Sequence, residues 1–150
     1  MTEVKQEVPD HIFALLGGLL DALRGDFQQE AKVLRQPYRK LRTSQLRLLT
    51  LTPREGMRLT DLAVRVGMTK QALGEFANVL EDDGFLESIK DPTDARVRIL
   101  RPTAKGRRAV EAGNRVIGAV EQRWRDQLGA ERWDRLRLLL AEAAAVRDHQ

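Results

Sequence analysis

The sequence predicts a mainly α-helical fold that contains one small β-hairpin. Apolar residues recur at three- and four-residue steps in three long segments, residues 10–34, 104–128 and 130–147, which is the spacing of amphipathic helices. Between the first two segments, two short runs flank the turn sequence Asp-Pro-Thr-Asp at 91–94, which is typical of a hairpin. A chain of 150 residues is long enough to bury one ordinary core.

The N-terminal helix is expected to begin at Asp10, which can cap it, and to end before Pro37. Its apolar stripe contains Gly17 and Gly18. Because each glycine costs a helix about 1 kcal/mol relative to alanine, we expect another helix to approach closely at this point.

The central part of the chain predicts three short helices and two strands. Thr60, Thr69 and Thr103 can each cap the helix that follows, because a threonine hydroxyl accepts a bond from a first-turn N–H group. Residues 54–58 are expected to form a loop. The expected helices are 43–51, 61–66 and 70 to about 83, and the expected strands are 85–90 and 97–101.

Residues 59–78 have the spacing of a helix-turn-helix. Leu62 and Val66 lie one turn apart on the first helix, and Ala63 is small enough for the point where the two helices touch. Gly67 supplies the turn residue that tolerates positive φ. The apolar residues expected beneath the second helix are Met68, Leu73 and Phe76.

The outward face of the second helix is polar, which favours nucleic-acid binding. Gln71 and Asn78 carry amides that can pair with adenine in the major groove, and Glu75 can accept a bond from cytosine. The helix N-terminus offers free N–H groups, which favour phosphate. A structural helical hairpin with an incidentally polar face is the alternative. The predicted DNA-binding positions of this helix are Thr69, Lys70, Gln71, Ala72, Gly74, Glu75 and Asn78.

The hairpin adds basic side chains beside that helix. Arg96 and Arg98 follow the turn, and Lys90 precedes it. An arginine on a projecting loop can enter the minor groove next to a recognition helix. Alternatively, Arg96 pairs with Asp94 or Asp91 and stiffens the turn, and both roles can coexist. The predicted DNA-binding positions of the hairpin are Lys90, Asp94, Arg96 and Arg98.

Basic residues are concentrated in the middle of the chain. Residues 35–108 hold 16 Lys or Arg against nine Asp or Glu, whereas the net charge of the whole chain is +4. This distribution fits an anionic partner, and a solvated charged surface is the alternative. No apolar run approaches the roughly 20 residues of a membrane span, the N-terminus has no signal-peptide pattern, and there is no cysteine. We therefore expect a cytoplasmic protein without membrane contacts.

The sequence contains no recognisable catalytic constellation, and we expect no enzyme activity, no cofactor and no metal. Ser44 and Ser88 are the only serines, and neither lies in a nucleophile-elbow sequence. His11 and His149 lie near opposite ends of the chain, a spacing that does not predict a transition-metal site.

The order of helix-turn-helix, hairpin and flanking helices resembles the MarR family of bacterial regulators over nearly the whole length. The most specific match is DPTDARVRILRPTAKG at 91–106, which is similar to the family's wing pattern DPxDxRxxxLxLTxxG. LEDDGFL at 80–86 is similar to the end of the family's recognition helix. The resemblance implies a dimer in which the N-terminal and two C-terminal helices interlock. The departures from the family pattern are Ser88, where an arginine is usual, Ala95, where a basic residue is common, and Pro102, where leucine is favoured.

Together these observations predict a winged helix-turn-helix protein that binds double-stranded DNA as a homodimer on a pseudo-palindromic operator and acts as a repressor. Residues 40–102 are expected to form the DNA-binding lobe, and residues 1–39 with 103–150 the dimerisation lobe. The family resemblance also implies a small aromatic or amphipathic effector, for which no binding residue can be assigned. Trp124 and Trp133 are expected to pack in a core or interface, and the alternative is that they line an effector pocket. The rival interpretations are a winged-helix adaptor that binds proteins and a helical bundle that binds a small molecule.

Overall fold

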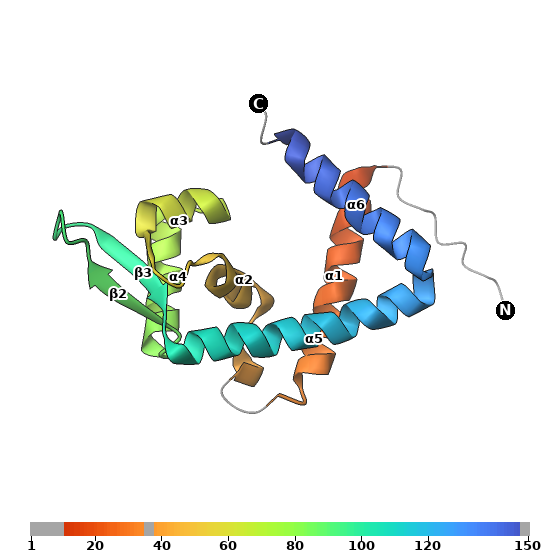
Figure 1. The fold of residues 1–150 in the computed structure, drawn as a ribbon, viewed down its shortest axis with the longest axis horizontal. Helices are drawn as coiled ribbons and strands as arrows, with labels where there is room; N and C mark the ends of the chain where they lie inside the picture. The colour runs from red at the N-terminus through yellow and green to blue at the C-terminus, as the bar shows by residue number, and fades with distance from the viewer. Residues whose placement is uncertain (1–10, 35–37, 148–150) are drawn as a thin grey trace. The chain divides into compact units, whose positions relative to one another are not determined.

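The computed structural model describes residues 11–34 and 38–147, and its elements follow the predicted order (Figure 1). The described chain is mainly helical with one small antiparallel sheet, which confirms the predicted fold class. Asp10 and Pro37, the predicted bounds of the first helix, lie outside the described residues. The elements are α1 (Ile12–Ala31), the 3₁₀ helix η1 (Tyr38–Lys40), α2 (Thr43–Leu51), β1 (Met57–Arg58), α3 (Leu59–Val66), α4 (Lys70–Asp82), β2 (Leu86–Lys90), β3 (Arg98–Pro102), α5 (Ala104–Leu128) and α6 (Ala130–Arg147).

The chain divides into two compact units. One contains residues 31–117, and the other contains the residues before and after that range. The predicted lobes meet near residues 39 and 103, whereas the units meet near 30 and 117, because the first half of α5 packs on α2. Gly113 of α5 lies so close to Leu46 of α2 that a Cβ at this position would collide with the leucine side chain. The assignment of DNA binding and dimerisation to particular parts of the chain stays a prediction.

The start of α3 differs from the sequence prediction. The helix begins at Leu59, and its N-cap is Arg58, whose φ of −58° and ψ of 138° are not helical and whose side chain makes no capping bond. Thr60 is therefore inside the helix, and its predicted role as a cap is wrong. The reason is the short strand β1, which pairs Met57 with Leu100 of β3 and leads straight into α3. Residues 57–58 thus belong to the sheet, where a loop was predicted.

The three strands form an antiparallel sheet in the order β1-β3-β2. Lys90 pairs with Arg98 at the turn end of the β2–β3 hairpin, which extends away from α3 and α4 (Figure 1). Both strands begin one residue later than predicted. The N–H of Phe85 closes the end of α4 by donating to Leu80 O at 2.8 Å, and the N–H of Val97 closes the hairpin turn by donating to Asp94 O at 3.0 Å.

The core of the 31–117 unit lies between the helix-turn-helix, the sheet and the start of α5. Leu73 is fully buried, whereas Met68 and Phe76, which were predicted to be buried with it, are half-buried and pack against the edge of this core. Gly106 allows α5 to start directly against Phe85, because a Cβ here would collide with the Phe85 carbonyl oxygen. The other large side chains at the centre of this core are Leu49, Leu62, Leu80 and Leu100.

The second unit contains the two tryptophans. The ring centroids of Trp124 and Trp133 lie 6.4 Å apart, and Trp133 is buried. The indole N–H of Trp124 donates to the carboxylate of Asp26 on α1 at 2.6 Å. The two rings therefore pack against each other, and the half-buried Trp124 also has a partner for its indole N–H.

Helix α1 leaves much of its apolar surface uncovered. Ile12 and Phe13 are 68% and 83% exposed. The close approach expected at Gly17 and Gly18 is not found within the described chain, since nothing lies within 4 Å of a Cβ built at either position. Among the described residues, no helix combines the length and the apolar character needed to cross a membrane.

Candidate nucleic-acid interface

The turn between α3 and α4 is built by Gly67. Its φ of 71° and ψ of 36° lie in the left-handed region, which glycine adopts without strain. The N–H of Gly67 donates to Val64 O at 3.2 Å, and the N–H of Met68 donates to Ala63 O at 2.9 Å. These two bonds satisfy the last carbonyls of α3 in the manner of a Schellman motif, which sets the angle at which α4 departs. The predicted turn residue is confirmed.

Thr69 caps α4, as its position in the sequence predicted. The backbone N–H of Ala72 donates to the Thr69 hydroxyl oxygen at 3.1 Å. Lys70, Gln71 and Ala72 of the first turn are exposed, so the free N–H groups of this helix end face solvent. Such an end, with its positive dipole, is a ready anion site.

Helix α4 has two distinct faces. Leu73, Ala77 and Leu80 are completely buried. The opposite face carries exposed Gln71 and Asn78, which are seven residues apart and therefore nearly superposed along the helix axis. Of the remaining predicted positions on α4, Glu75 is exposed and Gly74 is half-buried. The face of α4 that was predicted to contact DNA is therefore accessible, and the contact itself stays a prediction.

The hairpin turn is braced by Arg96. Its Nε and Nη2 donate to the two carboxylate oxygens of Asp94 at 3.1 and 3.3 Å, and its backbone N–H donates to Asp94 Oδ1 at 3.0 Å. These bonds, the side-chain one foremost, lower the pKa of Asp94. The Arg96 side chain is still 91% exposed, so the guanidinium also remains accessible to a ligand. The two interpretations of Arg96 are therefore compatible in this geometry.

Asp91 ties the turn end of the hairpin to Arg58, the residue that precedes the helix-turn-helix. Its Oδ1 accepts bonds from the backbone N–H and the hydroxyl of Thr93 at 2.8 and 2.6 Å, and its Oδ2 accepts bonds from Arg58 at 2.8 and 2.9 Å. The Thr93 bonds, helped by the charge of Arg58, lower the pKa of this buried carboxyl. Arg58 was missed by the sequence analysis, because it lies 33 residues from its partner in a segment without periodicity.

Arg98 is held against α4 instead of pointing freely into solvent. Its guanidinium donates to Ser88 Oγ at 2.7 Å, to Asn78 Oδ1 at 3.0 Å and to Glu81 Oε2 at 2.8 Å. Ser88 also donates to Glu81. Two positions predicted to contact DNA, Asn78 and Arg98, thus contact each other.

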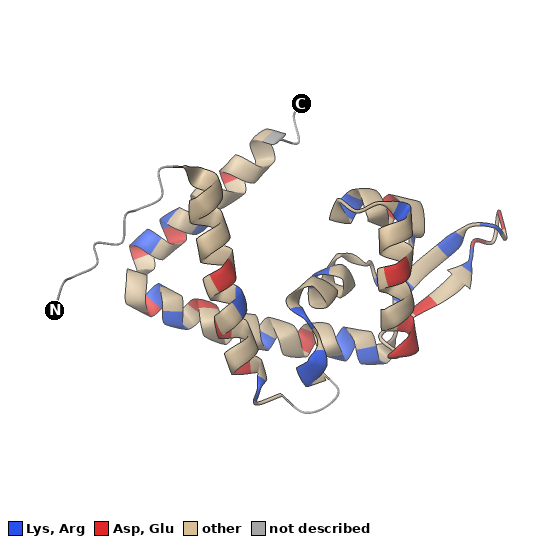
Figure 2. Cartoon of the chain, turned by 180° about the vertical axis from the view of Figure 1, so that it is seen from behind, with Lys and Arg blue, Asp and Glu red and all other residues tan. Residues whose placement is uncertain are grey.

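Several exposed cations surround this region, and Figure 2 shows basic positions on both hairpin strands with acidic ones at the turn. Arg54, Lys70 and Lys90 are exposed, and within residues 11–34 and 38–147 none of the three side chains forms an ion pair or hydrogen bond. Such unpaired cations can bind phosphates and release the counterions that are condensed on DNA.

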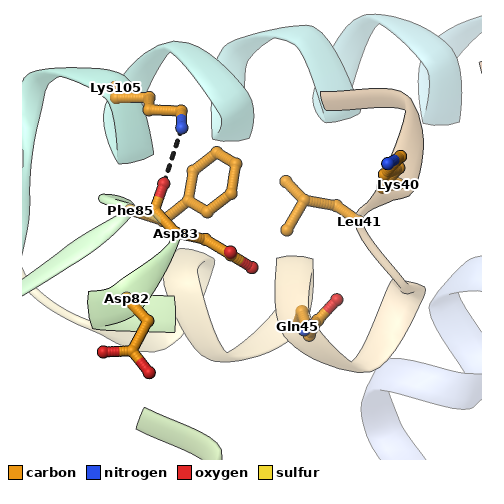
Figure 3. Close-up of a pocket in the computed structure, with 7 residues that line it drawn as sticks. All are labelled: Lys40, Leu41, Gln45, Asp82, Asp83, Phe85 and Lys105. Carbon is orange, nitrogen blue, oxygen red and sulfur yellow. Dashed lines mark hydrogen bonds between the residues drawn. The ribbon is translucent and has the colours of Figure 1, made fainter. Parts of the chain in front are cut away.

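A cleft of about 440 Å³ lies beside the end of α4 and the start of α2 and α5 (Figure 3). Lys105 crosses it, with its Nζ donating to Asp83 O at 2.6 Å and lying 4.5 Å from the centroid of the Phe85 ring. This arrangement closes the C-terminal end of α4, where a cation is favoured by the helix dipole. The residues that line the cleft are Lys40, Leu41, Gln45, Asp82, Asp83, Phe85 and Lys105.

Residues 42–97 match the model of the MarR family. The match includes α2, the helix-turn-helix, β2 and the turn of the hairpin. The resemblance drawn from the sequence is thereby confirmed. No curated protein matches the chain in sequence.

Solved structures resemble the chain beyond residues 42–97. A MarR-family transcriptional regulator from Rhodococcus sp. RHA1 is 21% identical, with a TM-score of 0.75 over 93% of this chain and 96% of that one. The transcriptional repressor CouR bound to a 23-mer DNA duplex is 25% identical, with a TM-score of 0.71 over 93% and 99%. CouR from Rhodococcus jostii RHA1 bound to p-coumaroyl-CoA is 22% identical, with a TM-score of 0.70 over 93% and 95%. The fold therefore extends over nearly the whole of these proteins.

Proposed function

We propose that this protein is a transcriptional regulator that binds double-stranded DNA sequence-specifically, with α4 as its recognition helix in the major groove. The observation that carries the proposal is the outward face of α4. Gln71 and Asn78 are exposed on it, opposite the buried Leu73 and Leu80, and the capped first turn leads into it. A helix with amides on its free face can contact base edges while its N-terminus contacts phosphate.

The hairpin serves as a wing in this proposal. Arg96 lies at the turn of this wing, and its side chain is 91% exposed although it is paired with Asp94. Such a side chain can reach the minor groove beside the major groove that α4 occupies. Exposed Lys90 and Lys70 would contact phosphates on either side. Most of the affinity would come from these charges and most of the specificity from α4.

The regulator acts as a homodimer in this proposal. The uncovered apolar residues of α1 and α6 support it, because a monomer rarely leaves such a surface in water. A two-fold dimer would place two copies of α4 about one helical turn of DNA apart, so the operator would be pseudo-palindromic. Sedimentation at micromolar concentration should give the mass of two chains, and a stable species of 17.0 kDa would contradict the proposal. The exposed apolar residues concerned are Ile12, Phe13, Leu15, Leu16, Leu20, Leu138, Leu139, Leu140 and Val146.

We further propose that the regulator is a repressor released by a small aromatic or amphipathic effector. The likeness to CouR, a repressor with one structure on DNA and one with p-coumaroyl-CoA, supports both parts. Transcription in vitro from a template that carries the selected site should fall when the protein is added. Titration with p-coumaroyl-CoA and simpler aromatic carboxylates should then restore it; unchanged transcription in all mixtures would contradict this extension alone.

The proposed role of α4 is tested by two neighbouring substitutions. Gln71→Ala should weaken binding to the preferred site by about 1–3 kcal/mol and binding to unrelated duplex much less, since an amide reads bases. Lys70→Ala should weaken binding to both duplexes alike, because its ammonium contacts phosphate. Fluorescence anisotropy at several salt concentrations measures both effects. If the wild-type protein shows no salt-dependent binding to any duplex, the alternative of a winged-helix adaptor that binds proteins is favoured.

A further inference from the structure

The contacts of Arg98 determine how the amide of Asn78 is oriented. The Nη2 of Arg98 lies 3.0 Å from Asn78 Oδ1 and 2.8 Å from Glu81 Oε2, and its Nε lies 2.7 Å from Ser88 Oγ. A guanidinium has five N–H donors and no acceptor. The amide atom that faces it must therefore be the carbonyl oxygen, and the amino group of Asn78 must point the other way.

The charge of Arg98 is engaged within the protein. Arg98 and Glu81 form an ion pair at 2.8 Å, and their side chains are 30% and 24% exposed. Because the carboxylate neutralises the guanidinium at close range, Arg98 is a weak candidate for a phosphate contact. The hydrogen bonds of Arg98 instead join three elements, since Asn78 and Glu81 lie on α4, Ser88 on β2 and Arg98 on β3.

Asn78 lies where its orientation matters for recognition. It is exposed on the same face of α4 as Gln71, two turns further along. Within the described residues, the Nδ2 group of Asn78 donates to no other side chain or carbonyl, so its two N–H donors are free. An unrestrained asparagine would offer adenine one donor and one acceptor together. The oxygen of Asn78 is already engaged, so only donors remain.

We propose that Arg98 is a positioning residue that makes Asn78 a donor-only reader of the major groove. Asn78 then selects a base pair edge that presents acceptors, such as guanine N7 and O6 or thymine O4, and rejects cytosine, whose N4 amino group is a donor. The paired donor and acceptor of adenine are not matched. This inference rests on the proposed function and adds to it the base preference at one position in each half-site.

The test is selection of bound sequences from random duplex DNA by four proteins: the wild type, Asn78→Asp, Arg98→Met and Lys90→Gln. Asn78→Asp keeps an acceptor for Arg98 but turns an acceptor outward in place of the amino group. It should retain the wild-type melting temperature and switch one position of each half-site from guanine or thymine to cytosine, by about ten-fold in relative affinity. Arg98→Met releases the amide to rotate, so adenine should gain at the same position.

Lys90→Gln is the matched control, because Lys90 is the cross-strand partner of Arg98 and is exposed without an ion pair in the described chain. It should weaken all duplexes alike and leave the selected sequence unchanged. Base preferences of Asn78→Asp and Arg98→Met that equal those of the wild type would overturn the inference while the proposed function stands. Should Arg98→Met fold poorly, Asn78→Asp decides alone. Enrichment of no sequence by the wild type would overturn the proposed function and this inference together.

Discussion

Removing the cap of α4 should weaken both the fold and the binding of DNA. In Thr69→Ala the hydroxyl oxygen that lies 3.1 Å from the Ala72 N–H is lost, so one first-turn donor has no protein partner. The loss of a threonine cap costs about 1 kcal/mol of stability. For a chain of this length that corresponds to a decrease of about 2–4 °C in melting temperature at fixed protein concentration. A frayed first turn also holds phosphate less well, by about two- to five-fold in affinity.

Two control variants separate the effect on DNA from the effect on stability. Thr69→Ser keeps the hydroxyl and should behave as the wild type in both thermal unfolding and anisotropy. Thr103→Ala removes a cap on α5, since the Gly106 N–H donates to Thr103 Oγ1 at 3.1 Å, and it also removes the bond from Thr103 Oγ1 to Gly84 O at 2.6 Å. It should therefore cost at least as much stability as Thr69→Ala while leaving the first turn of the recognition helix intact. A loss of DNA affinity in Thr103→Ala as large as in Thr69→Ala would refute the reasoning, because stability alone would then explain it.

Three further predictions concern the hairpin and the core. Arg96→Ala should leave the melting temperature nearly unchanged, because its ion pair with Asp94 is exposed, and should reduce the slope of log affinity against log salt by about 1; a large drop in melting temperature with intact affinity would contradict this. Asp91 has a folded-state pKa below the ordinary 3.8, so its contribution to stability is present above about pH 4 and is lost as the pH falls through the folded value. Denaturation of Asp91→Asn between pH 6 and 2.5 should therefore show a flatter acid limb than the wild type, and parallel limbs would count against it. Gly106→Ala should destabilise the fold by about 1–3 kcal/mol in urea unfolding, because α5 must move away from the Phe85 carbonyl, and a variant of wild-type stability would show that no such movement is needed.

The features that sequence analysis predicted well are those that local chemistry determines. Residues within one helical turn determine the cap at Thr69 and the left-handed turn at Gly67. They also determine the break at Gly129, where α5 ends and α6 begins. The apolar spacing likewise predicted the burial of Leu73, since a period of 3.6 residues leaves little choice of face.

The features that the sequence did not reveal depend on long-range pairing. Strand β1 has only two residues, so no alternation could identify it, and it exists because β3 offers an edge. The partners of Arg58 and Arg98 lie 33 and up to 20 residues away, and composition contains no signal for such pairs. Asn78 was therefore expected to use its whole amide, whereas the folded chain engages its oxygen.

The central claim is that α4 and the wing recognise a specific DNA sequence. It is tested most directly by selecting bound sequences from random duplex DNA with the purified wild-type protein and measuring the affinity of the winner against salt. The account predicts a pseudo-palindromic motif whose half-sites lie about 10 base pairs apart, with an affinity that falls steeply as salt rises. Enrichment of no motif, together with binding that does not respond to salt, would contradict it.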